Sequence, residues 1–445
     1  MSQSRSLFSK LSLFRRGLPR WTESSSVSFS HDYLTGLRGF LVLESLVWLF
    51  LQTFVPSLVT GDAQGPSYQV VLRKAFSVLL WNPSLIYSFF IILSARTVCV
   101  PFLQEPSVAS YAGSLIRRPL RIGIPLSIGL AVAIAIISQM GTSYIADAAS
   151  LLGNPTITVP SVPPTPLSAF NSIYNLLWVV RDFPLQAGNQ FWPSGTLWVP
   201  SLIYSQSYTV YLMMVILPFT RPTWHFQGFI IFSLGSFWLQ SWGWYSAAGL
   251  LLADVSSNPT LRSRLLSGIK FGENYACPSW LLAALLTVVG IALKYIWVAA
   301  FPQHLNAELM LHPALHLSDK PSLSSFELDP RQPYPRLDDY MVIVGVLLLL
   351  ETSQRLQSWF SAIVLTFLGE RSLSIFIAQS IIIYTAGLKL FIHLHVTLHL
   401  SLPASNVIVL VTCIPATLLC AEIFHRIVDV PARSIARAFS SWIRQ

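Results

Sequence analysis

Residues 33–50, YLTGLRGFLVLESLVWLF, place two charged side chains, Arg38 and Glu44, in a stretch that is otherwise mostly apolar. A charge inside the hydrocarbon of a bilayer is costly, and where it occurs it usually serves a function. The stretch therefore predicts a transmembrane helix with Arg38 at its mouth and Glu44 inside it.

The composition of the whole chain supports a membrane protein. Apolar residues make up 53% of the 445 positions and charged residues 11%, with a mean hydropathy of +0.58. A soluble domain normally carries about a quarter charged residues. The apolar residues fall in blocks of roughly 20, the length that crosses a bilayer as a helix. We therefore expect an all-α, polytopic integral membrane protein with a single membrane domain.

Hydropathy predicts about ten transmembrane helices, several of them shorter than ideal. The predicted spans are 40–58, 76–96, 120–140, 197–219, 226–240, 242–254, 279–301, 340–352, 372–393 and 403–424.

The basic residues of the loops predict the orientation. The segments 96–121, 254–278 and 426–445 are rich in arginine, and all three face the cytosol with the N-terminus if 226–254 forms two short spans. One long helix over 226–254 would put the second basic segment outside, so we reject it. The proline-rich loop 141–195 and the acidic loop 302–339 then face away from the cytosol.

These predictions divide the chain into a cytosolic tail (1–30), a membrane domain (31–425) and a second cytosolic tail (426–445). The first tail is rich in Arg and Ser and has no short apolar core with a cleavage site, which disfavours a signal peptide. A transit peptide is the alternative reading of such a leader. By default we expect the endoplasmic reticulum or another endomembrane.

The net charge of +9 raises the question of nucleic acid. No basic stripe is interleaved with stacking aromatic residues, so we expect no nucleic-acid partner. The lipid bilayer is the partner that the charge distribution predicts.

Residues 117–121, RRPLR, open the third predicted span, with Pro119 at the expected first helical position. A helix N-terminus and the guanidinium groups of Arg117, Arg118 and Arg121 together favour a bound phosphate. The alternative is a topology anchor that touches lipid headgroups, and the motif taken alone favours the anchor.

Six motifs occur in one order that resembles the acyltransferase-3 family of membrane acyltransferases, in particular its fungal members. The motifs are GLRG (36–39), FFIILSARTV (89–98), IRRPLRIGIP (116–125), GTLWVPSLIYSQSYTVYL (195–212), FLGERSLSIFIAQS (367–380) and VDVPARSIARAF (428–439).

The resemblance implies transfer of an acyl group, often acetyl, from cytosolic acyl-CoA to a hydroxyl group, with no permanently bound cofactor and no metal. It implies that Arg38 belongs to the catalytic span. It also implies that Arg118 and Arg121 bind the donor, and it places Ser94 at the family's Ser-Gly position, followed here by alanine. With Arg117 from the same cluster, we expect Arg118, Arg121 and Ser94 to form the acyl-CoA site. We expect a small hydroxylated acceptor, a secondary metabolite that reaches the site through the bilayer.

The chain departs from the family pattern at three positions. No histidine stands near Trp48, where the first span of the family carries one; Ile203 stands near the place of a glutamate, and Gln379 where a histidine often lies. Acyl transfer to an alcohol needs a group that takes the hydroxyl proton.

Glu44, about one turn before Trp48, is the predicted substitute for this base. The alternative is an ion pair between Glu44 and Arg38, Arg96 or Arg121 that only holds helices together, and the sequence leaves both readings open.

Two further groups of polar residues receive structural predictions. His393, His395 and His399 have a spacing that suits a metal, but a helix end at the interface is favoured. Glu422 and His425 are expected to cap the last span, which should end at residues 429–431.

Two other classes of function stay open. Buried charges in a multi-helix scaffold also suit a transporter or a lipid-handling protein. A catalytically silent relative that assists another enzyme is the third possibility.

Overall fold

The computed structural model describes residues 32–444, apart from 62, 64, 105–106, 180–182, 218–219, 221, 272–274, 306–307 and 309–331. The predicted N-terminal tail and most of the loop 302–339 therefore lie outside the described residues. The described part is helical except for one two-stranded antiparallel hairpin, in which β1 (Ile269–Phe271) pairs with β2 (Tyr275–Cys277).

The α-helices follow one another along the chain. They are α2 (Asp32–Phe54), α3 (Ser67–Leu72), α4 (Pro83–Gln104), α5 (Val108–Met140), α6 (Ser143–Leu152), α7 (Pro166–Trp178), α8 (Ala187–Gln190), α9 (Trp198–Ile216), α10 (Pro222–Trp238), α11 (Gly243–Ser257), α12 (Pro259–Ser267), α13 (Ser279–Tyr295), α14 (Leu337–Thr352), α15 (Gln354–Phe360), α16 (Ile363–Glu370), α17 (Ser372–Ile382), α18 (Leu388–Ile392), α19 (Leu402–Phe424) and α20 (Val430–Arg444).

Six helical segments of the described chain are long and apolar enough to cross a bilayer. They are Asp32–Phe54, Pro83–Leu103, Ser110–Met140, Ser279–Ala300, Ser372–Thr397 and Leu402–Ile443. Their outward faces carry large apolar side chains; on α13, for example, Leu285 and Val288 are about 60% exposed (57% and 62%). A polytopic helical membrane protein accounts for such a surface, because lipid replaces water around it.

The other four predicted spans also form helices, namely α9, α10, α11 and α14, of 19, 17, 15 and 16 residues. These helices are short for a bilayer about 30 Å thick, at about 1.5 Å per residue. Residues 226–254 form two helices, α10 and α11, separated by a turn at Gln240 with φ of 55°. A count of ten spans stays a prediction.

The second span begins at Pro83, seven residues later than predicted. Asn82 Oδ1 accepts a hydrogen bond from Leu85 N (3.2 Å), and this cap fixes the start of α4. The apolar residues from 76 onward belong partly to a separate π-type turn, Arg73–Ser77. The hydropathy pattern predicted a single span over both segments because both are apolar.

The third span corrects a prediction about Pro119. The helix α5 begins at Val108, where Ser107 accepts a hydrogen bond from Ser110 N, and Pro119 lies inside it. The segment 117–121 is therefore no helix N-terminus, and any anion at these arginines is bound by guanidinium groups without help from a helix dipole. Pro119 was predicted to lie in the first turn because, in sequence, an internal proline of a membrane helix cannot be told from a first-turn proline.

The last span does not end at residues 429–431 as predicted. A π-type turn, η12 (His425–Asp429), in which Val430 N donates to His425 O, carries the chain from α19 directly into α20. Pro431 sits in the first turn of α20, where its missing N–H matters least. The predicted C-terminal tail is thus largely a helix, and it packs along α5.

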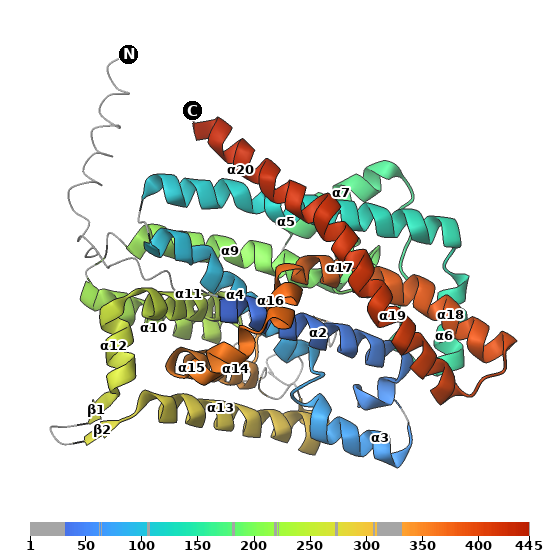
Figure 1. Ribbon diagram of the computed structural model, residues 1–445, viewed down its shortest axis with the longest axis horizontal. Helices are drawn as coiled ribbons and strands as arrows, with labels where there is room; N and C mark the ends of the chain where they lie inside the picture. The colour runs from blue at the N-terminus through green and yellow to red at the C-terminus, as the bar shows by residue number, and fades with distance from the viewer. Residues whose placement is uncertain are drawn as a thin grey trace, which may run out of the picture.

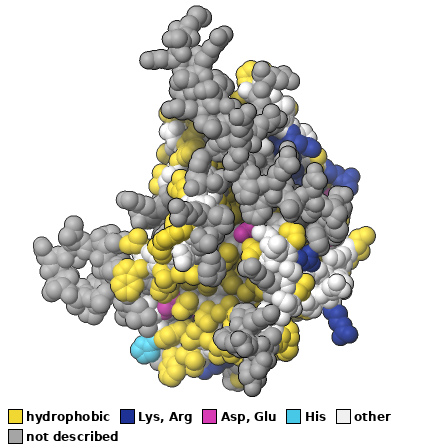
Figure 2. Space-filling view, turned by 90° about the vertical axis from the view of Figure 1, so that its left-hand side faces the viewer, with side chains coloured by type: hydrophobic (Ala, Val, Ile, Leu, Met, Phe, Trp, Pro, Cys, Tyr) yellow, Lys and Arg dark blue, Asp and Glu magenta, His cyan; other side chains and the backbone are white. Residues whose placement is uncertain are grey.

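The helices lie roughly side by side, with the main connecting segments at the two ends of the bundle (Figure 1). The start of α5, the helix α12, the β-hairpin and the C-terminal end of α20 all lie at the left-hand end in that view. Figure 2 looks at this end and shows most Lys and Arg side chains in its right-hand half, with hydrophobic side chains over the left and lower parts. The basic segments of the sequence therefore share one end of the bundle.

Glycines decide how closely α2 approaches the end of α15 and the helix α16. A Cβ atom added at Gly36 would lie 1.6 Å from Phe360 O, and one added at Gly39 would lie 1.9 Å from Leu365 O. On the other side, a Cβ at Gly369 would lie 1.8 Å from Thr35 O. The two backbones touch directly, so the GLRG motif fixes the position of the helix that carries Arg38.

Candidate functional site

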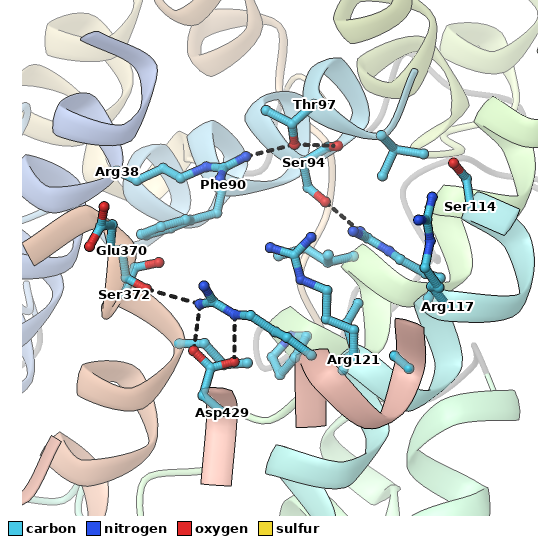
Figure 3. Close-up of a pocket in the computed structure, with 18 of the residues that line it drawn as sticks. Arg38, Phe90, Ser94, Thr97, Ser114, Arg117, Arg121, Glu370, Ser372 and Asp429 are labelled. Carbon is cyan, nitrogen blue, oxygen red and sulfur yellow. Dashed lines mark hydrogen bonds and ion pairs between the residues drawn. The ribbon is translucent and has the colours of Figure 1, made fainter. Parts of the chain in front are cut away.

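A cavity of about 680 Å³ opens between the helices α2, α4, α5, α9, α16, α17 and α20 (Figure 3). Its apolar walls come mainly from α4, α9 and α17, for example Phe90, Ile203 and Phe376. Its polar groups are mainly arginines and hydroxyl groups. This combination of one apolar wall and several convergent polar groups is typical of a ligand site.

Six arginines line the cavity, contributed by three helices that are distant in sequence. They are Arg38 on α2, Arg117, Arg118 and Arg121 on α5, and Arg433 and Arg437 on α20. The cavity therefore brings together Arg38, Ser94 and the three α5 arginines, all of which the sequence singled out.

Neutral groups orient two of these guanidiniums. Arg38 donates to Thr97 Oγ1 (2.6 Å) and more weakly to Leu93 O (3.4 Å). Arg118 donates to Ser94 Oγ (2.6 Å) and to Ser207 Oγ (3.0 Å), as the dashed contact in Figure 3 shows for Ser94. The hydroxyl groups hold each guanidinium in place and leave its positive charge uncompensated.

The charge balance of the cavity is strongly positive. The lining contains two carboxylates, Glu370 and Asp429, against six arginines. Among the described residues, only Arg433 of the six has a carboxylate within 4.0 Å, namely Asp429. Like charges that share a cavity of low dielectric constant repel one another, and a bound anion relieves this repulsion. The arrangement is suited to a polyanionic ligand.

The contribution of α20 to the cavity was not predicted from the sequence. Arg433 donates to Asp429 through two nitrogens, at 2.5 and 3.2 Å, and to the backbone oxygen of Glu370 at 3.1 Å. Asp429, Arg433 and Arg437 follow one another at intervals of four residues, so they lie on one face of a helix. That spacing was a usable signal, but Pro431 was taken as the end of the helix.

Glu44 does not line the cavity. It lies six residues after Arg38, which turns it about 240° around α2. It has no hydrogen-bond or ion-pair partner among the described residues, and Arg96, one of its expected partners, is paired with Glu351 instead. The ion-pair reading of Glu44 thus finds no partner in this part of the chain, and its role as a base stays a prediction.

The six motifs that carried the family resemblance all contribute to this cavity. Their lining residues include Arg38 from the first motif, Ser94 and Thr97 from the second, Arg118 and Arg121 from the third, Pro200 and Ile203 from the fourth, Glu370 and Ser372 from the fifth, and Arg433 and Arg437 from the sixth. Segments spread over some 400 residues of sequence thereby meet at one place.

Two of the three positions where the chain departs from the family-like pattern, Trp48 and Gln379, lie together in a neutral polar group, while the third, Ile203, lines the cavity. Gln379 donates to Ser45 Oγ (3.0 Å), which lies 3.3 Å from the hydroxyl group of Tyr87. Trp48 packs edge-on against Tyr87, with ring centroids 5.6 Å apart. This group is buried next to Phe376, which lines the cavity.

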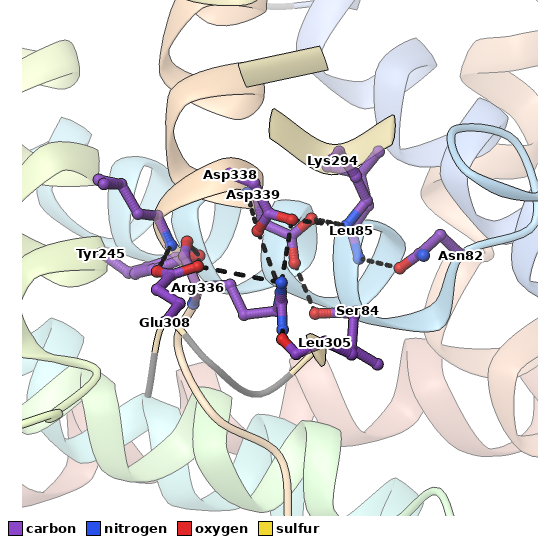
Figure 4. Close-up of polar contacts among 11 residues, drawn as sticks. Asn82, Ser84, Leu85, Tyr245, Lys294, Leu305, Glu308, Arg336, Asp338 and Asp339 are labelled. Atoms are coloured by element: carbon purple, nitrogen blue, oxygen red, sulfur yellow. Dashed lines mark hydrogen bonds and ion pairs between the residues drawn. The ribbon is translucent and has the colours of Figure 1, made fainter. Parts of the chain in front are cut away.

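A second charged cluster lies at the junction of α13, α14 and the start of α4 (Figure 4). Lys294 pairs with Asp339 and lies 3.8 Å from Asp338, while Arg336 Nε lies 3.1 Å from Asp338. Glu308 approaches Arg336 at 3.9 Å and accepts a hydrogen bond from Leu337 N. Burial raises the pKa of the Glu308 carboxyl from its usual 4.5 to about 7.

The remaining predicted polar residues lie away from the cavity. His395 Nδ1 donates a hydrogen bond to Leu400 O (2.9 Å), and its ring stacks on Phe391, near the end of its helix. Glu422 pairs with Arg371 and, at 2.6 Å, with Arg426. In the described parts of the chain, no three His, Cys, Asp or Glu side chains are grouped so as to hold a metal ion.

Comparisons with protein-family models, with characterised proteins and with solved structures each find no match to this chain. The fold and the site together therefore define a helical membrane protein with six candidate spans and an arginine-lined cavity.

Proposed function

We propose that this protein is a membrane-bound acyltransferase that moves an acyl group, in the simplest case acetyl, from acyl-CoA to a hydroxyl group of a small acceptor. The observation that carries the proposal is the cavity in which five arginines have no acidic partner among the described residues. The phosphates of CoA are groups that guanidiniums bind well. The convergence of all six family-like motifs on this cavity supports the same assignment.

The proposed reaction needs one proton acceptor. The acceptor hydroxyl attacks the thioester carbonyl, a base takes the hydroxyl proton, and the CoA thiolate leaves and is protonated in turn. Arginines near the cavity mouth bind the donor, and the apolar wall formed by α4, α9 and α17 suits an acceptor that arrives from the bilayer. A small secondary metabolite is the acceptor class that we favour.

We place the cavity on the cytosolic side of an endomembrane, by default the endoplasmic reticulum. The arginine-rich segments share one end of the bundle with the start of α5 (Figure 1), and positively charged loops face the cytosol. Acyl-CoA is then available directly at the cavity.

The proposal is tested with membranes that contain the full-length protein, labelled acetyl-CoA and an extract of candidate acceptors. We expect label on an acceptor with the wild type. We expect about 10- to 100-fold less with Arg118→Gln, since hydrogen bonds to charged groups contribute about 1.5–3 kcal/mol. Arg426→Gln is the matched control, because Arg426 is largely exposed and does not line the cavity.

Absence of labelled acceptor at normal protein levels, with all acyl-CoA recovered intact, would contradict the proposal. Equal turnover of Arg118→Gln and Arg426→Gln would mean that the protein is an acyltransferase whose acyl-CoA site does not include Arg118.

The base is tested separately, because two carboxylates compete for the role. Glu44 is the acidic group of the first span but lies outside the cavity; Glu370 lines the cavity and is largely exposed. If Glu44 is the base, Glu44→Gln abolishes turnover at unchanged protein level and Glu370→Gln does not. If Glu370→Gln abolishes turnover and Glu44→Gln does not, Glu370 is the base. If both variants retain turnover, neither carboxylate is the base.

A transporter or lipid-handling protein is the second candidate function. The observation that favours it is that Glu44 lies outside the cavity, so that an anion site stands without the predicted base. Uptake of a labelled phosphate compound into vesicles without covalent change would support this alternative over acyl transfer.

A further inference from the structure

The arginines of the cavity fall into two groups on different walls. Arg38 and Arg118 are oriented by hydroxyl groups of α4 and α9. Arg433 and Arg437 come from α20, and Arg121 on α5 points between the two groups in Figure 3. The two walls meet through the packing of α20 along α5 and through the hydrogen bond from Arg433 to Glu370 O on α16.

The wall formed by α20 holds Arg433 in place. Asp429 takes two hydrogen bonds from Arg433 and also contacts His425 Nδ1 at 2.9 Å. The backbone oxygen of Glu370 fixes a third contact of Arg433. Arg437, one turn further along α20, lines the cavity and has no ion-pair partner among the described residues.

The total charge also indicates more than one anionic group. With both lining carboxylates ionised, the cavity has an excess of four positive charges. A phosphate monoester carries about −1.5 to −2 at neutral pH, so one such group neutralises only about half of the excess. Two separate anionic groups balance it.

We infer that α20 forms a second phosphate subsite, in which Arg437 and Arg433, with Arg121, bind an anionic group distinct from the one at Arg38 and Arg118. The ligand class is then a nucleotide-like molecule with phosphates at two positions. The identification with CoA, which has a diphosphate bridge and a ribose phosphate, rests on the proposed function.

The test measures binding to the full-length protein in lipid nanodiscs with three probes: CoA, dephospho-CoA, which lacks the ribose phosphate, and adenosine 3′,5′-bisphosphate. The variants are Arg437→Gln for the α20 subsite and Arg118→Gln for the other. We expect each variant to weaken CoA binding about 10- to 100-fold. With dephospho-CoA, we expect one of the two variants to lose its effect, because its subsite then has no phosphate to bind.

Two further variants control for effects that do not come from loss of a phosphate contact. Arg426→Gln, on the same continuous helix but outside the cavity, should bind every probe like the wild type. The double variant Asp429→Asn with Arg433→Gln removes a positive and a negative charge together, so it tests Arg433 without leaving a buried carboxylate unpaired.

Three results would overturn the inference: no effect of Arg437→Gln on CoA binding, equal losses for both variants with dephospho-CoA, or no binding of any probe by the wild type. The proposed function fails differently. If the wild type binds CoA with both subsites but transfers no acyl group, the two subsites are supported and the acyltransferase function is refuted. If acyl transfer occurs and Arg437→Gln binds CoA like the wild type, the proposed function is supported and the second subsite is refuted.

Discussion

The molecule contains two clusters of charged residues that differ in how they are compensated. Around Lys294, each cation has at least one carboxylate within 4.0 Å, and the carboxylates of Asp338 and Asp339 are fully buried. Around Arg118, five of the six arginines have no carboxylate within 4.0 Å among the described residues, and Arg38 and Arg118 contact hydroxyl groups and a backbone oxygen instead. The helix α4 connects the two, because Ser84 contacts Asp339 and Ser94 lies about 15 Å further along the same helix.

The difference in charge compensation indicates that the cluster around Lys294 stabilises the fold, whereas the arginines around Arg118 suit ligand binding. A buried ion pair whose members satisfy one another contributes to holding its helices, and removing one member leaves an unpaired charge. A cluster of like charges destabilises the protein until something binds there. The two clusters should therefore respond in opposite ways to loss of a single charge.

The largest effect is expected for Lys294→Met. This change leaves Asp338 and Asp339 side by side with only Arg336 to compensate them, which should cost about 3–5 kcal/mol of unfolding free energy. Thermal unfolding in detergent, followed by size-exclusion chromatography, measures it. The double variant Lys294→Met with Asp339→Asn removes one charge of each sign and should recover much of the loss; a single variant as stable as the wild type would refute the comparison.

The second effect concerns the arginine cavity. Arg118→Gln removes a positive charge from an uncompensated cluster, so the unfolding temperature without ligand should stay the same or rise. Addition of CoA at about 100 times its dissociation constant should stabilise the wild type by about 2.7 kcal/mol. The variant should lose most of this stabilisation, and a drop in its ligand-free stability comparable to that of Lys294→Met would show that the two clusters are alike.

A comparable effect, which depends on pH, is expected from Glu308. Its pKa is raised to about 7 in the folded protein, so between about pH 4.5 and 7 the folded state holds a proton that the unfolded chain has lost. This contribution to stability should therefore be fully present below about pH 4.5 and fall by about 3 kcal/mol in total as the pH rises from there through 7. Unfolding curves of the wild type and Glu308→Gln at several pH values measure this; the variant should lack this part of the slope, and identical slopes would disprove the assignment.

The smallest effect is expected for Arg426→Gln. The side chain of Arg426 is 75% exposed and pairs with Glu422, which Arg371 also contacts. Such exposed pairs contribute about 0.2–1 kcal/mol, so stability, ligand binding and turnover should all stay close to those of the wild type. A large loss of binding in this variant would mean that the anion site extends beyond the cavity.

The sequence predicted the helical membrane class well, because apolar blocks long enough to cross a bilayer are rare in soluble domains. It located boundaries less well where two apolar segments adjoin, as before Pro83, or where a proline lies inside a helix, as at Pro119 and Pro431. Proline marks a possible helix end in sequence, but neighbouring helices and a π-type turn accommodate it in the structure.

The site was predicted in part. Arg38, Ser94 and the arginines of α5 stand in motifs that single them out in the sequence, and they do share a cavity. The arginines of α20 were assigned only to the topology, since no local pattern shows that α20 folds back along α5. Glu44 was chosen because it is charged within a span, but charge alone does not say toward which side of the helix a residue points.

The direct backbone contact between α2 and α16 has a mechanical consequence. Where Gly36 and Gly39 touch Phe360 and Leu365, no side-chain torsions lie between the two backbones to absorb displacement. The wall that carries Arg38 and the wall that ends at Glu370 must therefore move as one stiff body. Arg433, which donates to Glu370 O, joins α20 to this stiff unit, so the distance between Arg38 and Arg433 is set largely by backbone contacts.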